Sequence, residues 1–459
     1  MTKVKPLNDD ANVTYEPLLD PESSLFFFLS EPAISTISFF DRNVDLERSR
    51  AWLKERLGLI CAANPWLAGR LVRKKKMHRN VLLATPTPAT DNDVEALLGG
   101  DEDGVLANMS HRTRYETLYD ALSKANAVVG PGYKLVGKDK RCAKFSLVEM
   151  AEGQVALIVS ITHAVADGEH LISTSSGWFS IWHLSTNRSL GYTYYKIMSM
   201  LERKNNVTRL SPKRKHEFFP KSKEAIGAKE FKFLLSVPFA VCCVRSMLFG
   251  PKARLGAQFV DAARVRERKE EAAETKAEDG FVSTNDLLVS AFSRAARADV
   301  LLMAINLRGR VEGTDAADAG NYSSVVLHDA DSAASPEGVR RSLAAGPPFL
   351  RRGGRPLPGA LRTMTRTRAA MITNWAFPDF EATVSLPDAA GAAVPLDLHL
   401  PVPYNPREIV FPIAVVFKPR KGKLGFLYGG APGRLSHEDL AAVGAPLGEQ
   451  ICNEMFANE

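Results

Sequence analysis

One histidine of this sequence stands where a side chain can act as a base. His163 follows the nearly all-apolar run 154–161, and the segment from His163 to Gly168 reads HAVADG. An imidazole at the end of a strand can point into a cleft, and with an ordinary pKa of about 6.5 it accepts a proton at physiological pH. The pattern H-x-x-x-D-G therefore indicates general base catalysis, with His163 as the candidate catalytic residue.

The two other defined positions of this pattern have their own physical uses. Asp167 lies four residues after His163, and its carboxylate can either orient the imidazole or pair with a buried arginine that braces the turn. Gly168 allows a tight turn that a β-carbon would obstruct. The alternative is that His163, one of nine histidines in the chain, is a packed and hydrogen-bonded loop residue. The short pattern alone leaves both interpretations open.

Two strands are expected to position His163. The segments 142–149 and 154–161 have strand-like composition and are separated by a turn at residues 151–153. The second segment is nearly all apolar, which is typical of a strand buried on both faces. A helical stretch is expected after the histidine, through about Ile181. Upstream, the apolar spacing of 45–60 predicts a helix with Asp45 as its N-cap, followed by a helix end and a strand within 64–71.

The second half of the chain repeats this alternation of helices and strands. A charged helix over 262–278 precedes Ser283 and Asp286, whose spacing resembles a capping box at the start of an apolar-periodic helix. Residues 329–362 are rich in Ala, Gly, Pro and Arg and are expected to form a long loop with one helix. The later elements expected are strands at 394–400, 411–418 and 423–428, and an amphipathic helix from about Ser436. Strands on both sides of a central crossover predict an α/β fold with two units of similar size.

The crossover itself has an unusual composition. Between Arg203 and Lys232 there are ten Lys or Arg residues against three acidic ones, and the most apolar stretch of the chain, 231–250, follows. Its uncharged run extends only from Phe233 to Val244, which is too short to span a bilayer, since a span takes about 20 apolar residues. The stretch is either a buried helix covering the core or an interfacial anchor beside a basic flank. We place the domain boundaries at 1–200, 201–280 and 281–459.

Composition excludes several classes of protein. The chain has 459 residues, 45% of them hydrophobic, and a formal net charge of +7, so it is neither disordered nor highly charged for its length. Five cysteines in a chain of this size cannot form a dense disulfide framework, and the N-terminal residues carry charge without an apolar stretch. We therefore expect a cytoplasmic protein and leave open a peripheral location on an intracellular membrane.

The sequence lacks the residue spacings that other kinds of functional site require. The basic segments lack the aromatic interleaving and the motifs of nucleic-acid binders, so no nucleic-acid partner is expected. Cys242 and Cys243 are adjacent rather than in a C-x-x-C pair, and the histidines show no metal-binding spacing, so no metal is expected. The sequence contains no phosphate-binding glycine-rich loop and no G-x-S-x-G, which leaves a nucleotide cofactor and a serine nucleophile unsupported.

A series of motifs in a fixed order resembles the CoA-dependent acyltransferase superfamily, which includes the BAHD acyltransferases and has the chloramphenicol acetyltransferase-like fold. HAVADG resembles the active-site motif of that superfamily, and the other similar segments extend over nearly the whole chain. They are NPWLAGRL at 64–71, STNDLLVSA at 283–291, NLRGR from Asn306 to Arg310, GNY at 320–322 and Asn374-Trp375.

The resemblance implies a fold and a mechanism. It implies two similar α/β domains, each with a mixed sheet, and a catalytic histidine in a tunnel at their interface. His163 would take a proton from an acceptor hydroxyl or amine as it attacks the thioester of acyl-CoA, without a covalent acyl-enzyme. Asp167 would point away from the substrate and pair with Arg308 or Arg310, next to Asn306, with Arg70 as a more distant candidate. The alternative for Arg308 and Arg310 is a solvated strand end.

The sequence departs from the family pattern at two places. The D-F-G-W-G segment of the plant branch is missing, and Asp379-Phe380 and the residues up to Leu386 stand roughly in its place without the glycines. This leaves the oxyanion donor and the contacts that brace the two domains unassigned. The residue before His163 is Thr162, where peptide-synthetase condensation domains and bacterial wax-ester synthases usually carry a second histidine. This favours a stand-alone acyltransferase over a carrier-protein condensation domain.

The resulting prediction is a monomeric acyltransferase that moves an acyl group from acyl-CoA to a hydroxyl or amine acceptor. Acyl-CoA would be a dissociable co-substrate, with no permanently bound cofactor, and the acceptor would be a small molecule or a lipid alcohol. Two alternatives stay open. One is a lipid-directed, wax-ester-type synthase that contacts a membrane through 231–250, and the other is a non-catalytic binding module that keeps the fold.

Overall fold

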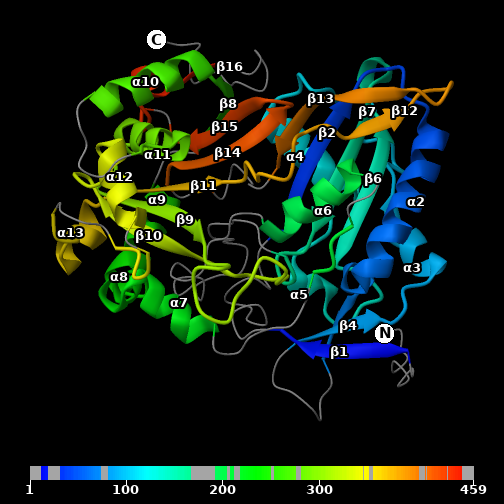
Figure 1. The fold of residues 1–459 in the computed structure, drawn as a ribbon, viewed down its shortest axis with the longest axis horizontal. Coiled ribbons are helices and arrows are strands. Elements are labelled where there is room, and N and C mark those ends of the chain that lie inside the picture. The colour runs from blue at the N-terminus through cyan, green and yellow to red at the C-terminus, as the bar shows by residue number, and fades with distance from the viewer. Residues whose placement is uncertain are drawn as a thin grey trace.

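The fold was analysed in a computed structural model of the whole chain (Figure 1). The structure describes residues 12–18, 32–73, 81–166, 192–203, 207–210, 218–249, 253–274, 281–344, 346–350, 355–402, 409, 411–431 and 433–446. In this part of the chain two large mixed β-sheets lie side by side, each covered by helices, as the sequence predicts for an α/β protein.

The first large sheet contains the strand that leads to His163. It has six strands in the order β12-β13-β2-β7-β6-β5. Their bounds are β12 Ser385–Pro387, β13 Ala393–Pro401, β2 Ile34–Phe40, β7 Val155–Ile161, β6 Ala143–Glu149 and β5 Leu98–Gly99. β6 and β7 pair antiparallel in the predicted hairpin, and every residue of β7 is buried. A central strand buried on both faces needs this apolar composition.

The second large sheet is built mainly from the C-terminal half of the chain. It has seven strands in the order β10-β9-β11-β14-β15-β8-β16. Their bounds are β10 Ser323–Asp329, β9 Val300–Asn306, β11 Ala369–Asn374, β14 Ile413–Arg420, β15 Lys423–Gly430, β8 Arg254–Val260 and β16 Gly444–Pro446. Because β9, β11 and β14 run parallel, their C-terminal ends meet at one edge of the sheet.

A third, smaller sheet has the order β1-β4-β3 and lies below the six-stranded sheet in Figure 1. Its strands are β1 Val13–Pro17, β4 Leu82–Pro86 and β3 Arg70–Val72. The segment 64–71 therefore forms a short 3₁₀ helix, Pro65–Ala68, and then enters this small sheet. The strand prediction at this place is confirmed, although the strand is only three residues long.

Helices cover the sheets and connect them. On the six-stranded side they are α2 Leu46–Ala63, α3 Asp91–Glu95, α4 Tyr115–Lys124 and α5 Gly132–Leu135, followed along the chain by α6 Tyr192–Glu202. On the seven-stranded side they are α7 Phe218–Ile226, α8 Ala228–Leu234, α9 Val237–Phe249, α10 Ala262–Glu274, α11 Thr284–Ala295, α12 Pro336–Ala344, α13 Ala360–Thr365 and α14 His437–Ala441. Both predicted N-caps, Asp45 for α2 and Ser283 for α11, accept the backbone hydrogen bonds expected of them.

Three elements differ from the sequence predictions. The segment 329–362 contains α12 and the start of α13 rather than one helix, since Pro336 fits the first turn of α12, where its missing N–H costs nothing. The helix after Ser436 is only five residues long. The predicted crossover 201–280 includes β8, a strand inside the seven-stranded sheet. The division into domains stays a prediction.

One segment of the C-terminal half joins the two large sheets. After β11 the chain leaves the seven-stranded sheet, and β13 pairs antiparallel with β2 in the six-stranded sheet. A continuous cluster of buried apolar side chains then extends through both sheets. The two sheets consequently share one core, and the edge where they meet is held by packing as well as by the chain connection.

His399 on β13 is a polar residue that is fully buried in this shared core. Its Nδ1 lies 2.9 Å from the Ser38 hydroxyl, and its Nε2 lies 3.2 Å from the Tyr195 hydroxyl. Burial lowers the pKa of His399 from its usual 6.5 to about 3. The ring is therefore neutral in the folded protein at neutral and mildly acidic pH, and its two nitrogens lie within hydrogen-bond distance of the two hydroxyls.

This burial predicts an acid-sensitive contribution to stability. The pKa of His399 is lowered in the folded state, so below its unfolded pKa of 6.5 protons bind preferentially to the unfolded chain. We expect the free energy of unfolding to fall by about 1 kcal/mol for each pH unit from 6.5 toward 5. The variant His399→Gln keeps a side chain that can hydrogen-bond and should lose this part of the pH dependence in urea unfolding. Equal slopes in both proteins would contradict the prediction.

Candidate functional site

The backbone around His163 is fixed by the end of the β6–β7 hairpin. The amide of Thr162 donates to the carbonyl of Cys142 at 2.8 Å, and the amides of Val165 and Ala166 both turn back to the carbonyl of Thr162. The chain therefore leaves β7 in a tight turn that begins at the histidine. His163 is 1% exposed, so its imidazole is enclosed by the protein rather than facing bulk solvent.

A second motif meets this turn from the other large sheet. Asn321, which lies between β9 and β10, donates from Nδ2 to the carbonyl oxygen of His163 at 3.0 Å. Asn321 is also 1% exposed. This hydrogen bond brings HAVADG of the six-stranded sheet together with the GNY segment at 320–322 of the seven-stranded sheet. The two motifs lie 158 positions apart in sequence.

Two of the predicted site residues lie outside the described residues. The described segment that contains His163 ends at Ala166, so Asp167 and Gly168 are not placed. The proposed ion pair of Asp167 with an arginine therefore stays a prediction, as does the tight turn assigned to Gly168.

Arg308 is buried at the same junction. It is 7% exposed, unlike a solvated strand end. Its Nε donates to the carbonyl of Asp318 at 2.8 Å, and its Nη2 donates to the carbonyl of Gly320 at 2.5 Å and to the hydroxyl of Thr193 at 3.1 Å. The guanidinium also lies over the ring of Tyr192, 4.6 Å from its centroid. Arg308 thus connects the loop before Asn321 to α6.

The other predicted cations lie elsewhere. Much of the surface of Arg310 is exposed, and its guanidinium lies over the ring of Phe349. Desolvation by the surrounding protein atoms and the positive charge of Arg340 lower the pKa of Arg310. Arg70 forms its ion pair with Asp139 at the surface. Of the three arginines singled out in the sequence, only Arg308 therefore lies in the described surroundings of His163.

Asn306 closes the base of this arrangement. It is the last residue of β9, and its Oδ1 accepts hydrogen bonds from the amide of Arg308 at 3.1 Å and from the Nη1 of Arg308 at 3.2 Å. The side chain of Asn306 thereby caps the turn that carries the arginine. The N-x-R part of the motif acts as one hydrogen-bonded unit, while the second arginine of the motif is separate from it.

Two further motif segments meet at the same edge of the seven-stranded sheet. Asn374, at the end of β11, donates to Oδ1 of Asn285 in the first turn of α11 at 3.0 Å. Asp286 of the capping box is fully buried and pairs with Arg340, whose Nε and Nη2 lie 2.9 and 2.5 Å from its Oδ2. The STNDLLVSA segment therefore has a structural use that its sequence did not reveal: it anchors α11 to α12.

The segment in place of the missing D-F-G-W-G docks on α6. Asp379 pairs with Lys196, and the carboxylate of Glu202 accepts the amides of Glu381 at 3.0 Å and Thr383 at 2.7 Å. Burial raises the pKa of Glu202, and these two hydrogen bonds oppose the rise. Contacts that brace the junction thus exist without the glycines, although none of them identifies an oxyanion donor.

Helix α6 is the element that sequence analysis missed. It supplies Thr193 to Arg308, Tyr195 to His399 and Glu202 to the 379–383 segment. The signal in the sequence was a tyrosine-rich run: three of the six residues 192–197 are tyrosines. Aromatic side chains at this density indicate a buried element, since they bury large areas and present a polar tip to a partner, but they do not distinguish a helix from a strand.

Comparison with solved structures identifies the fold. Vinorine synthase is 13% identical, with 98% of this chain and 97% of that chain covered and a TM-score of 0.50. TRI101 of F. graminearum, complexed with coenzyme A and deoxynivalenol, is 14% identical over 93% of this chain and 96% of that chain, with a TM-score of 0.53. TRI101 of F. sporotrichioides, complexed with coenzyme A and T-2, is 16% identical over the same shares, with a TM-score of 0.50.

No family model matches the sequence, and no curated protein matches it. The solved structures nevertheless cover nearly the whole chain, so the predicted fold is confirmed: this chain has the two-sheet α/β fold of vinorine synthase and the TRI101 proteins. The tunnel that the resemblance implies beside His163 stays a prediction.

Removing Arg308 should cost more than removing the neighbouring Arg310. Arg308→Ala leaves the carbonyls of Asp318 and Gly320 without this donor in a buried site, at about 1–3 kcal/mol for each unsatisfied group. We expect a loss of about 2–4 kcal/mol in the free energy of unfolding, measured by urea titration. Arg310→Ala is the matched control and should cost less than about 1 kcal/mol. Equal losses would contradict the assigned geometry.

Proposed function

We propose that this protein is an acyltransferase that moves an acyl group from acyl-CoA to a hydroxyl or amine acceptor, with His163 as the general base. The observation that supports it most is the position of His163 in this fold. The residue lies in the turn that follows the central strand β7, and Asn321 from the loop before β10 of the other sheet donates a hydrogen bond to its carbonyl. The similar TRI101 structures are complexes with coenzyme A.

The proposed reaction needs one proton carrier. The imidazole of His163 accepts the proton of the acceptor hydroxyl or amine while the acceptor atom bonds to the thioester carbonyl carbon. The tetrahedral intermediate collapses with cleavage of the carbon–sulfur bond, and the imidazolium returns its proton to the leaving CoA thiolate. The products are the ester or amide and free CoA, and no acyl group is attached to the protein. General base catalysis of this kind contributes about 10²–10⁴-fold to the rate.

In this proposal the other motif residues position the base. Asn321 holds the carbonyl of His163, and Arg308 holds the carbonyl of Gly320 one residue before Asn321. Asn306 in turn holds the Arg308 guanidinium. Such a chain of buried hydrogen bonds restrains the backbone that carries the imidazole, and a near-attack geometry requires such positioning. Asp167 and Gly168 would complete the support, as the sequence motif suggests.

A non-catalytic binding module is the second candidate. It is favoured by the enclosure of His163, which is 1% exposed, and by the missing D-F-G-W-G segment. The acceptor class, including the lipid alcohol of a wax-ester-type reaction, belongs to the proposal. The two candidates differ in one measurable respect, since only the enzyme releases CoA thiol.

The enzyme proposal predicts loss of turnover in His163→Ala. Free CoA thiol is measured with short, medium, long and aromatic acyl-CoAs against pools of alcohols and amines. The variant should lose at least about 10²-fold in turnover with the productive pair, because the acceptor proton has no carrier. His111→Ala is the matched control, since His111 contacts Gln154 at the opposite end of β7. Full turnover in His163→Ala would exclude the mechanism, whereas acyl-CoA binding without any turnover would favour the binding module.

Asn321 offers a separate test of positioning. Asn321→Ala removes the hydrogen bond to the His163 carbonyl but keeps the imidazole side chain itself. We expect kcat to fall by about tenfold or more with little change in KM for acyl-CoA, because a small misplacement of the base lowers the rate of the chemical step. Asn43→Ala, on an exposed turn, is the control. A change in KM alone would contradict the positioning role.

A further inference from the structure

Helix α9 is apolar on two opposite faces. Phe239, Ala240, Cys242 and Cys243 are buried against the protein. On the other side Val237, Val241, Val244 and Leu248 follow one another at helical spacing, and three of these four are classed as exposed. A surface helix of a globular protein normally presents polar residues to solvent, and a helix that is apolar all round is usually covered. The outer face of α9 therefore requires an explanation.

Exposed apolar side chains are concentrated around this helix. Of the ten large hydrophobic side chains that are exposed in the described part of the chain, six lie between Leu235 and Phe249 or on the adjoining helix α13. They include Leu248 at 63%, Phe249 at 81% and Leu361 at 72% exposed. Single exposed apolar residues are ordinary, but a cluster on two adjoining helices marks an interaction surface.

A strongly basic cavity adjoins the same cluster. It has a volume of about 530 Å³ and is lined by five arginines, by Phe249 and by other residues among which there is no Asp or Glu. The arginines are Arg245, Arg297, Arg366, Arg368 and Arg434. The cavity lies near Ala369, where β11 begins, so the length of the strand separates it from Asn374 and the junction with His163.

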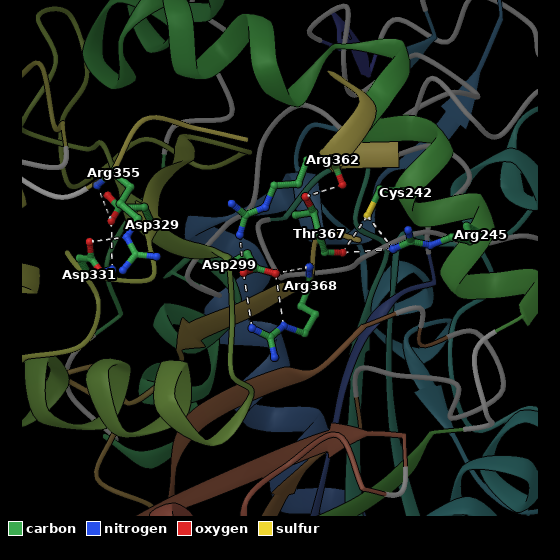
Figure 2. A network of polar contacts seen from close by, with 9 residues as sticks. All are labelled: Cys242, Arg245, Asp299, Asp329, Asp331, Arg355, Arg362, Thr367 and Arg368. Carbon is green, nitrogen blue, oxygen red and sulfur yellow. Dashed lines mark hydrogen bonds and ion pairs between the residues drawn. The ribbon is translucent and has the colours of Figure 1, made fainter. Parts of the chain in front are cut away.

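Most of these arginines have no carboxylate partner among the described residues. Figure 2 shows that Arg368 and Arg362 both reach Asp299, and that Arg245 instead reaches Cys242 and the carbonyl of Thr367. Burial alone would raise the pKa of Asp299, but its contacts with the two arginines lower it, so Asp299 is ionised and offsets one positive charge.

Arg245, Arg297, Arg366 and Arg434 form no ion pair within the part of the chain that the structure describes. Four cations without carboxylate partners around one cavity attract anions, and guanidinium groups bind phosphate oxygens in pairs of hydrogen bonds. A soluble phosphate compound would pair with the arginines of the cavity but would leave the apolar outer face of α9 in water. An anionic lipid layer satisfies both, because its phosphates face the arginines and its acyl region receives the apolar side chains.

We propose that the face formed by α9, α13 and this arginine-lined cavity binds the surface of an anionic phospholipid bilayer. The headgroup phosphates lie against Arg366 and Arg434, and Leu248 and Phe249 insert into the boundary of the acyl chains. Binding is peripheral. Among the helices of the described residues, none has both the length and the apolar character of a bilayer span. The proposal concerns a surface separate from His163 and does not depend on the reaction.

The arrangement also bears on both interpretations that the sequence left open for 231–250. The inner face of α9 covers the core, as a buried helix would, while its outer face has the composition of an interfacial anchor. Each of the two interpretations describes a different face of this helix. The sequence could not separate them because the cations of the cavity come from distant segments, at 297, 366 and 434.

The test is binding of the full-length protein to sedimented vesicles. Vesicles of phosphatidylcholine alone are compared with vesicles in which part of it is replaced by phosphatidylserine. Wild type should bind the anionic vesicles and should dissociate with added salt. Arg366→Gln/Arg434→Gln should lower the partition coefficient by about 25-fold, since one basic residue near an anionic surface contributes about fivefold. Leu248→Ser/Phe249→Ser should lower it by about tenfold or more.

Matched variants control for charge, apolarity and folding. Arg42→Gln/Arg112→Gln removes two exposed arginines elsewhere, and Leu59→Ser removes an exposed leucine on α2; both should bind like wild type. Thermal unfolding verifies that every variant is folded. The proposal is overturned if wild type binds neither kind of vesicle. It is equally overturned if the face is a dimer contact that the α9 variants abolish, or if pyrophosphate binds in calorimetry while anionic vesicles do not.

Discussion

The buried guanidinium of Arg308 is the group on which the junction between the two sheets depends. A charge in a protein interior is tolerated only when its donors are satisfied. Here carbonyls of residues 318 and 320, an asparagine side chain and the Thr193 hydroxyl accept from it. Meeting that requirement fixes the 318–321 loop against α6, and Asn321 is thereby placed to hold the carbonyl of His163. The position of the histidine thus follows from the need to solvate one cation without water.

The joining of the sheets gives the 318–321 loop a rigid border on both sides. The chain passes from β11 to β13, so the six-stranded sheet contains strands from both halves. Its 379–383 segment is held by Glu202, and His399 is held by Ser38 and Tyr195. Two rigid sheets with a common core leave little freedom at their border, which is the condition that the proposed general base would need for accurate positioning.

Much of the architecture could be predicted from local patterns. The apolar run of β7, the capping box at Ser283 and the strands near 394–428 all have short-range signals. What could not be predicted depends on contacts between distant segments. Arg308 and Arg310 have similar sequence surroundings, yet one is buried and the other exposed, because only Arg308 meets α6. Most residues of that helix are buried, so its sequence does not show a broad polar face.

The seven-stranded sheet separates two kinds of surface. At one edge Asn306 and Asn374 face the junction, where the Arg308 guanidinium and the Asn374 amide donate hydrogen bonds to other groups of the protein. At the other edge the arginines around 366 and 434 are left to an external anion. A charge at the first edge must be paired internally because water is excluded, whereas a charge at the second can be paired by a ligand. The length of β11, at a rise of about 3.3 Å per residue, keeps these two edges of the sheet apart. An enzyme anchored through the second edge would therefore keep its reaction site clear of the membrane, and a membrane-soluble acceptor would have to leave the bilayer to reach His163.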